Sequence, residues 1–584
     1  MTFGRIRNLI LTGAATVYAA SCIYVDDNLG QNFIPGDQIY DVALADFPLK
    51  EIRMGYADSL SAYSSSRITV GSIRDSKFGL STRSSAFTVV PVMDTIDVGK
   101  NPQVIQFHFT AARDTTSVED RYQKDILQNI YVHKLHHVLD STYLYTNDLN
   151  DEMFSTDELI SKGTVVYDGG DSLSFDFSDK FAEEMVALFM KDPDIQMDLD
   201  EYLEEMPGIY LRTDPQTGEG GRINMFACPI EISDSYYVTG NYAELKIRSD
   251  YGERKDVDTT FLFYFGPQER TTTTSQYAFN VCRSANDGTL QTVEIPAAEN
   301  RTRAKLYKST DGRIYVEGGS GLKPVISAQE IKDLLSEHLA KEGLAPNEVI
   351  INKASLILPF DEYINSGEYD YDQNYMLPDI LSPTCRFSYK TGMKKEGSAE
   401  NIRYVTYAGL TDASVESENQ GDVNLSLSQY SPDISHHVQE ILTAPDDSIA
   451  TGRYDIWLLV MVNEVITTTD ENQQEMSEYY QNLAYASYYN NLYGGYGYGY
   501  GYGYGGYGYD SYYSNYYNYM LAAQYASASA VQQETITQLD KDRFYRLIIN
   551  APAQDGAEDT GNHPKLSVVY SYVSRDADSS LRSE

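Results

Sequence analysis

Apolar and polar residues alternate along much of this chain, which is the period-two pattern of strands that bury one face. Residues 105–109 and 173–177 show it, with Ile, Leu or Phe at every second position. Continuous apolar runs at 261–265 and 457–462 are instead typical of strands that are buried on both faces. Gly, Pro, Asp and Asn separate many short runs of this kind. The pattern predicts a mainly β protein built from antiparallel β-sandwiches or jelly rolls.

A few segments have helical spacing instead. Ser327-Ala-Gln-Glu330 has the form of a capping box, the apolar positions from Ile331 to Leu339 share one helix face, and Gly343 can end the helix. Two further segments, 181–189 and 434–442, place apolar residues at i, i+4, i+7 and i+8. These spacings predict three short, core-facing helices.

The last two helices suggest an internal repeat. Each follows an alternating strand, at 173–177 and at 423–427, and these are preceded by the strand-like segments 129–135 and 351–358. The shared order predicts two related β-sandwich or jelly-roll-like units. Chance similarity between ordinary β patterns is the alternative.

The second unit is interrupted by a Tyr/Gly-rich insertion, 467–541, in which the strand pattern stops. Residues 479–525 contain 19 Tyr, and Gly and Tyr alternate at their centre. In an extended chain the alternation would place the rings on one face, where they can stack on sugars or other aromatic groups. A low-complexity loop without fixed structure is the alternative. The candidate interaction residues are Tyr496, Tyr498, Tyr500, Tyr502, Tyr504, Tyr507 and Tyr509.

The amino terminus has the pattern of an export signal. Arg5 and Arg7 precede a mostly apolar stretch, and small residues lead directly to Cys22. This arrangement predicts a bacterial lipoprotein signal, removed after residue 21, with Cys22 as the lipidated first residue of the mature chain. An ordinary signal cleaved near Ser21 is the alternative.

These patterns together predict a domain organisation. We expect a signal peptide at 1–21, a tether at 22–66, a first β-sandwich at 67–268, a connector at 269–305, and a second β-sandwich at 306–575 that contains the insertion.

The chain is strongly acidic, with 45 Lys and Arg against 85 Asp and Glu and a net charge of −40. This excess of acid argues against nucleic acid or an acidic membrane surface as a partner. Besides Cys22 the chain has Cys228, Cys282 and Cys385, with no CxxC spacing, so the cysteines support neither a zinc site nor a thioredoxin-like site.

Sequence motifs give little reason to predict catalysis. A GxGxxG match inside the Gly-Tyr alternation is a by-product of the repeat. His133 and His137 would share a strand face and could bind a metal, but buried or surface histidines are favoured; His436 and His437 are interpreted as solvated or helix-end residues. The acidic run 192–201 is interpreted as a solvated turn. We therefore expect a protein that is not an enzyme, with no catalytic residues, metal or cofactor.

Three blocks carry a resemblance to a known family: Tyr315-Val-Glu-Gly-Gly-Ser-Gly-Leu322, Ile350-Ile-Asn-Lys-Ala-Ser-Leu-Ile-Leu358 and Pro564-Lys-Leu-Ser-Val-Val-Tyr570. With the lipoprotein start, they resemble the domain-of-unknown-function 4270 family, predicted lipoproteins of the Bacteroidota. The resemblance covers most of the mature chain, and the Gly-Tyr insertion is its clearest departure. It implies a mostly β protein anchored to the outer membrane, and it supplies no catalytic residues.

The expected function is that of a non-catalytic, lipid-anchored outer-membrane protein, exposed at the cell surface rather than in the periplasm. It would act as a scaffold or accessory subunit for an envelope complex, with an outer-membrane barrel protein as a possible partner. The alternative is a glycan-binding surface lipoprotein, and a hydrolase built on a β-sandwich ranks last.

Overall fold

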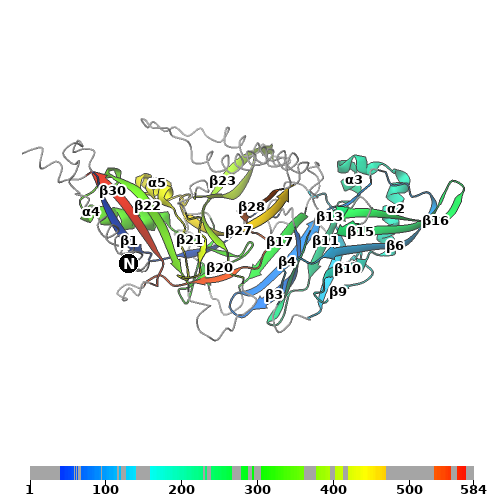
Figure 1. Cartoon of the computed structure of the whole chain (residues 1–584), viewed down its shortest axis with the longest axis horizontal. Helices are drawn as coiled ribbons and strands as arrows, with labels where there is room; N and C mark the ends of the chain where they lie inside the picture. Colours follow the sequence, from blue (N-terminus) through cyan, green and yellow to red (C-terminus); the bar gives the residue numbers. More distant parts are fainter. Residues whose placement is uncertain are drawn as a thin grey trace, which may run out of the picture.

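The computed structural model is mainly β, as the alternating pattern predicts, and its strands pair antiparallel in several sheets. Two β units lie end to end (Figure 1). The first unit comprises residues 67–286, and the second comprises residues 40–57 and 292–573. The structure describes residues 40–57, 60, 62, 67–93, 95–114, 117–119, 126–139, 158–227, 230–232, 238–265, 278–286, 292–294, 304–360, 376–394, 401–411, 419–468, 532–553 and 562–573.

The first unit is a sandwich of two sheets. The smaller sheet has the order β10 (Ser172–Asp176), β6 (Lys100–Ala112), β15 (Tyr242–Tyr251), β16 (Arg254–Phe265) and β5 (Val89–Pro91). The larger has the order β7 (Val118–Glu119), β12 (Gly220–Ala227), β3 (Arg67–Asp75), β4 (Gly79–Phe87), β11 (Ile209–Thr213), β8 (Gln128–Lys134) and β9 (Val165–Tyr167), with β17 (Ala278–Ala285) also paired to β4. β13 (Ile230–Ile232) and β14 (Val238–Gly240) pair with each other, and α2 (Asp179–Lys191), η3 (Ile195–Met197) and α3 (Leu199–Glu205) follow β10.

The core between these sheets is aromatic. Phe107 and Phe109 on β6 are buried, and the Phe107 ring stacks on Phe181 of α2 with centroids 6.0 Å apart. Ser178 caps α2 by accepting a hydrogen bond from the Phe181 N–H. The predicted alternation at 173–177 is confirmed, because Leu173, Phe175 and Phe177 are all buried.

The second unit is also built around two main sheets. The five-stranded sheet has the order β1 (Tyr40–Pro48), β30 (Lys565–Val573), β22 (Val349–Pro359), β26 (Gln429–Tyr430) and β25 (Val423–Asn424). The other has the order β18 (Thr292–Glu294), β19 (Leu306–Ser309), β2 (Arg53–Tyr56), β21 (Leu322–Ile326), β27 (Ile456–Thr468), β23 (Ile380–Lys394) and β24 (Asn401–Gly409), with β28 (Gln532–Leu539) also paired to β27. β20 (Ile314–Glu317) pairs with β29 (Arg546–Ile549), and the helices are α4 (Ala328–Lys341), η4 (Pro346–Glu348), α5 (Ser435–Thr443) and α6 (Asp446–Ile449).

The helices predicted from the apolar spacings at 331–339 and 434–442 form as α4 and α5, and both bury their apolar faces in the core of the second unit. The predicted capping box at the first of them is wrong. The Ser327 side chain makes no capping bond, and the Glu330 carboxylate instead accepts from the backbone N–H groups of Lys50 and Glu51. A segment nearly three hundred residues away in sequence therefore competes successfully for the carboxylate that a local motif would have used.

The two units share one strand order, so they are related as the repeat predicts. In the first, β6 lies between β10 and β15, and β11 lies between β4 and β8; in the second, β22 lies between β26 and β30, and β27 lies between β21 and β23. The helices α2 and α5 follow the equivalent strands β10 and β26. The equivalence expected between 129–135 and 351–358 is wrong, because β22 corresponds to β6.

The chain enters the second unit before it builds the first. The predicted tether, 22–66, is wrong for residues 40–56, since β1 pairs with β30 and β2 pairs with β21. The predicted connector, 269–305, is wrong for β17, which pairs with β4 of the first unit, and for β18, which pairs with β19. The first unit is therefore inserted into the second, and the chain crosses between them twice.

The segment that contains the Gly-Tyr tract joins two neighbouring strands. β27 and β28 pair from Met461 with Leu539 to Thr468 with Gln532, so the two ends of segment 469–531 lie side by side. The tract is an insertion between adjacent strands of one sheet, as predicted, although both strands extend a little into the range 467–541. The seven candidate tyrosines, Tyr496 to Tyr509, and Cys22 lie outside the described residues.

The expected strand at 423–427 is wrong. Only Val423 and Asn424 form a strand, and Leu425 and Leu427 lie in the tight turn before β26, where their side chains are 52% and 62% exposed. The hydrogen bond from the Leu427 N–H to the Asn424 side chain closes this turn. Alternation of apolar residues therefore marks an exposed hairpin here and not a core-facing strand.

Candidate functional site

The most extensive buried arrangement of functional groups lies where the two units meet, and it begins with apolar contacts. Phe78 belongs to the turn between β3 and β4 of the first unit, yet it is buried in the core of the second. Its ring meets Tyr315 edge to face, with centroids 5.4 Å apart. In the opposite direction, Phe544 of the second unit packs with Ile73, Ile223 and Met225 of the first. Each unit thus places a Phe among apolar residues of its neighbour.

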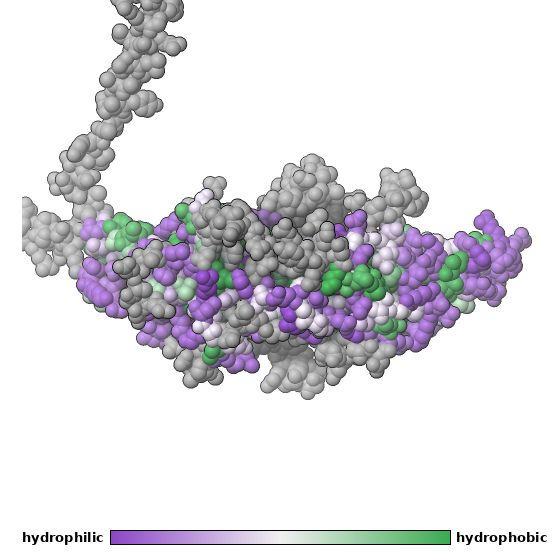
Figure 2. Space-filling view, turned by 90° about the horizontal axis from the view of Figure 1, so that it is seen from below, coloured by the Kyte–Doolittle hydropathy of each residue, from purple (hydrophilic) through white to green (hydrophobic). Residues whose placement is uncertain are grey.

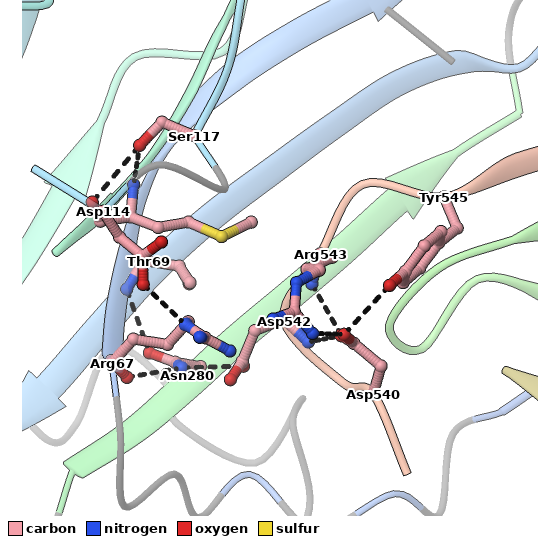
Figure 3. Close-up of polar contacts among 10 residues, drawn as sticks. Arg67, Thr69, Asp114, Ser117, Asn280, Asp540, Asp542, Arg543 and Tyr545 are labelled. Atoms are coloured by element: carbon pink, nitrogen blue, oxygen red, sulfur yellow. Dashed lines mark hydrogen bonds and ion pairs between the residues drawn. The ribbon is translucent and has the colours of Figure 1, made fainter. Parts of the chain in front are cut away.

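Asn280 on β17 is the polar centre of this junction (Figure 3). Its side-chain N–H donates to the Asp542 carboxylate of the second unit over 2.8 Å and to the Arg67 carbonyl over 3.0 Å. Its oxygen accepts from the Thr69 N–H and from the Ser85 hydroxyl. All the hydrogen-bonding capacity of a carboxamide that is only 4% exposed is therefore used, and one of its bonds crosses between the units.

The segment that carries Asp542 is held in shape by a second carboxylate. Asp540 accepts from the N–H groups of Asp542 and Arg543, and its other oxygen accepts from the Arg543 guanidinium and the Tyr545 hydroxyl (Figure 3). Burial raises the pKa of Asp542. Arg67, which forms an ion pair with Asp114 at 3.1 Å, lies on the other side and lowers the pKa of Asp542.

A glycine-rich turn, 318–321, forms the next part of the junction. A Cβ at Gly319 would lie 2.8 Å from Cys282 Sγ and 2.9 Å from an Arg83 nitrogen, so only glycine lets the turn approach β4 and β17 this closely. Gly319 also has a φ of +57°, which favours glycine. The Ser320 hydroxyl donates to the Cys282 carbonyl over 2.7 Å and so joins the turn to the first unit.

Buried charges surround this turn. Within the part of the chain that the structure describes, the Arg83 guanidinium makes no hydrogen bond, and its charge is balanced at longer range by Asp542, Glu317 and Asp540. Burial lowers the pKa of Arg83 to about 10 and that of Lys323 to about 7. The Lys323 ammonium donates to the carbonyls of Glu317, Gly319 and Gly321.

This arrangement suits a joint better than a reaction centre. Its polar atoms mostly bond to one another or to the backbone. Removing one member of such a network leaves buried groups without partners, which costs more than the bond itself contributes. The two units are therefore held in one orientation by many mutually dependent contacts.

A second polar group lies on the outer face of the smaller sheet of the first unit. The Ser174 hydroxyl is 2.7 Å from His108 Nε2, and His108 Nδ1 is 2.7 Å from the Asp176 carboxylate, which also accepts from Gln106. This is the hydrogen-bond order of a hydrolase triad. However, His108 and Asp176 side chains are 32% and 33% exposed on an open sheet, where water screens the carboxylate that a triad would keep buried.

The structure also brings together a thiol and an imidazole. Cys385 Sγ lies 3.6 Å from His437 Nε2, but the same nitrogen is 2.8 Å from the Tyr454 carbonyl. Because a carbonyl only accepts, Nε2 must carry the proton and cannot take one from the thiol. Burial lowers the pKa of His437 to about 4, so the ring is neutral at pH 7. Of the two interpretations of these histidines, solvation holds for the exposed His436 and is wrong for the buried His437. A place at a helix end fits both, since they lie in the first turn of α5.

The other histidine and acidic candidates have structural partners. His133 is buried, with Nδ1 against the Glu158 carbonyl and Nε2 accepting from Arg212, so neither ring nitrogen remains for a metal. His137 lies beyond the end of β8 and does not share a strand face with it. In the acidic run, Asp198 caps α3 and Asp194 accepts from the Thr95 hydroxyl.

Sequence reasoning missed the residues that form the junction. Phe78, Asn280 and Asp542 belong to no motif and are separated by hundreds of residues. Only Gly318 to Gly321 gave a signal, as part of a block that carried the family resemblance.

No protein-family model, curated protein or solved structure matches this chain. Among the described residues, no helix combines the length and apolar content needed to cross a membrane.

Proposed function

We propose that this protein is a non-catalytic, lipid-anchored envelope protein that acts as a rigid scaffold or accessory subunit of an outer-membrane complex. The junction between the units is the observation that carries the proposal. A catalytic or transport role needs parts that move or react, whereas two crossings of the chain, two exchanged Phe side chains and the Asn280–Asp542 bond all favour a single fixed body.

The positions of the anchor and the tract support the same role. The described chain begins at β1, at the end of the molecule that lies away from the first unit (Figure 1). Lipidation at Cys22 would therefore attach that end to the membrane. The Gly-Tyr tract leaves and re-enters the body between the paired strands β27 and β28, so a rigid sheet edge would present it to a partner. The strongly acidic body and the nearly uncharged tract offer different surfaces.

Two changes test this proposal in cells. Cys22→Ser should lower the share of the protein in the membrane fraction and abolish acylation of the mature N-terminus, and deletion of residues 479–525 should leave the body folded while removing its partner. The partner is measured by affinity purification of the full chain from detergent-solubilised envelopes, followed by determination of stoichiometry in the purified complex. Absence of acylation at Cys22 in the parent would contradict the anchor. A stoichiometric complex that survives the deletion unchanged would contradict the role of the tract.

A glycan-binding role is the second candidate, and the polar group around His108 on the smaller sheet of the first unit favours it; we call this group the polar row. Ser174, His108, Asp176 and Gln106 form a continuous, solvent-facing chain of donors and acceptors, and such planar polar side chains suit sugar hydroxyls. Binding to an array of bacterial and host glycans, lost in His108→Ala and Asp176→Ala, would support this candidate. Absence of binding to any glycan would leave the scaffold role as the remaining proposal.

A further inference from the structure

The sheet at the anchored end has one covered face and one bare face. Phe47, Leu566, Val568 and Tyr570 point inward and are buried in the core with α4 and α5. The opposite side chains of β1 and β30 alternate with these, and the register pairs Tyr40 with Val573 and Leu44 with Val569. We call the outward-facing side of β1, β30 and β22 the outer face.

The outer face is unusually apolar for an exposed surface. Val42 and Leu44 are 66% and 70% exposed, and Tyr40, Ile350 and Val573 are each 45% exposed or more. Figure 2 shows one of several groups of hydrophobic side chains at this end of the molecule. A strand that faced water would carry polar residues at these positions, so this surface is typical of one that contacts something apolar.

The charge of the outer face also differs from that of the whole chain, which has a net charge of −40. On these three strands its charged residues are Asp46, Lys565 and Lys353, and the Asp46 carboxylate is paired with the Lys565 ammonium at 2.6 Å. Lys353 is exposed. The outer face therefore carries no unpaired acid among the described residues, while the rest of the surface would be repelled by anionic headgroups.

The short segment between the proposed lipid anchor and β1 keeps this face close to the membrane. Cys22 precedes Tyr40 by eighteen residues, which even when fully extended span about 60 Å. We infer that the outer face rests on the lipid bilayer surface, with Val42 and Leu44 at the level of the headgroups and Lys353 beside them. This inference rests on the proposed lipid anchor. It gives the anchored end a second membrane contact, which orients the body in addition to tethering it.

The experiment uses the mature full chain with Cys22→Ser, so that no acyl chain contributes. Binding is measured by co-flotation with vesicles of phosphatidylcholine and of phosphatidylcholine with phosphatidylglycerol. We expect measurable partition into both kinds of vesicle, and a loss of at least tenfold in Val42→Thr/Leu44→Thr. Thr keeps the strand propensity of β1 while removing its apolar side chains. Ile105→Thr, at a site that is 46% exposed on β6 of the first unit, is the matched control and should partition as the parent does.

Three results would overturn the inference. They are absence of partition in the parent, equal partition in the double variant, and a dimer in solution that the double variant dissociates, since the face would then be an interface between two copies. Unfolding of each variant, followed by Trp457 emission, shows whether β1 remains in place. Because the vesicle assay uses an unlipidated chain, its failure is distinguishable from failure of the anchor, which is tested by acylation of Cys22 in the parent.

Discussion

Phe78→Ala tests whether the two units behave as one body. Phe78 is 1% exposed and comes from the first unit, but its ring lies in the second core against Tyr315, with the Arg546 guanidinium 5.2 Å from the ring centroid. Truncating a buried Phe to Ala costs about 3–5 kcal/mol. This cost already includes the free energy lost with the edge-to-face and cation–π contacts, so their contributions are not added to it. We therefore expect Phe78→Ala to remove about 4 kcal/mol of coupling between the units, without touching the first unit's own core.

Two probes of urea unfolding, one specific to the second unit and one common to both units, test this expectation. Trp457 is the only tryptophan, is fully buried and lies in β27, so its emission reports the second unit. Far-UV circular dichroism reports both units. In the parent the two transitions should coincide, and in Phe78→Ala they should separate, because the units no longer stabilise each other to the same extent.

Phe189→Ala is the matched control. Phe189 is fully buried in the core of the first unit and lies away from the junction, so its truncation should shift the transitions without separating them. Coincident transitions in Phe78→Ala, or a loss below about 0.5 kcal/mol, which is typical of surface substitutions, would refute the reasoning.

Three further predictions concern single sites. The unfolded chain binds a proton at His437 near pH 6.5 and the folded chain only near pH 4, so the free energy of unfolding should fall by up to roughly 3 kcal/mol as the pH is lowered across this window. In His437→Gln the urea midpoint should fall less steeply with pH than in the parent, and an identical fall in both would contradict the burial of His437. A fluorophosphonate probe should leave Ser174 unmodified, as judged by peptide mass spectrometry, because the row is open to water; labelling that disappears in His108→Ala would show an activated nucleophile. Gly55→Ala would place a Cβ 2.3 Å from the Trp457 ring, so we expect a loss of about 1–3 kcal/mol and a changed emission spectrum, and unaltered emission and stability would argue against that contact.

The sequence predicted the fold class because strand periodicity is a local property. Alternation at 105–109 and 173–177 and helical spacing at 181–189 each depend on neighbours a few residues apart. The structure confirms the second and third, and at 105–109 it buries Phe107 and Phe109 but leaves Ile105 exposed. The same reasoning failed at 423–427, where a two-residue strand and a turn share the alternating pattern. Periodicity records which side chains are apolar, and it does not record whether a face meets a core.

The junction was not predictable in this way. Asn280 and Asp542 are ordinary polar residues until β17 and the segment before β29 meet, and that meeting depends on the pairing of strands far apart in sequence. The strand β1 was missed for a different reason, since it carries apolar residues on both sides, Val42 and Leu44 outward and Ala43, Ala45 and Phe47 toward the core, and so shows no alternation. Its place becomes evident only through its pairing with β30.

The pairing of β1 with β30 has a consequence for how the protein is made. The first strand of the body finds its partner more than five hundred residues later, so the second unit cannot close until nearly the whole chain has been synthesised. The inserted unit is complete much earlier and can fold while the rest is still emerging. Contacts this distant in sequence form slowly, so the strand edges of the second unit stay exposed while the chain folds. A truncated product that lacked β30 would leave β1 without its partner strand.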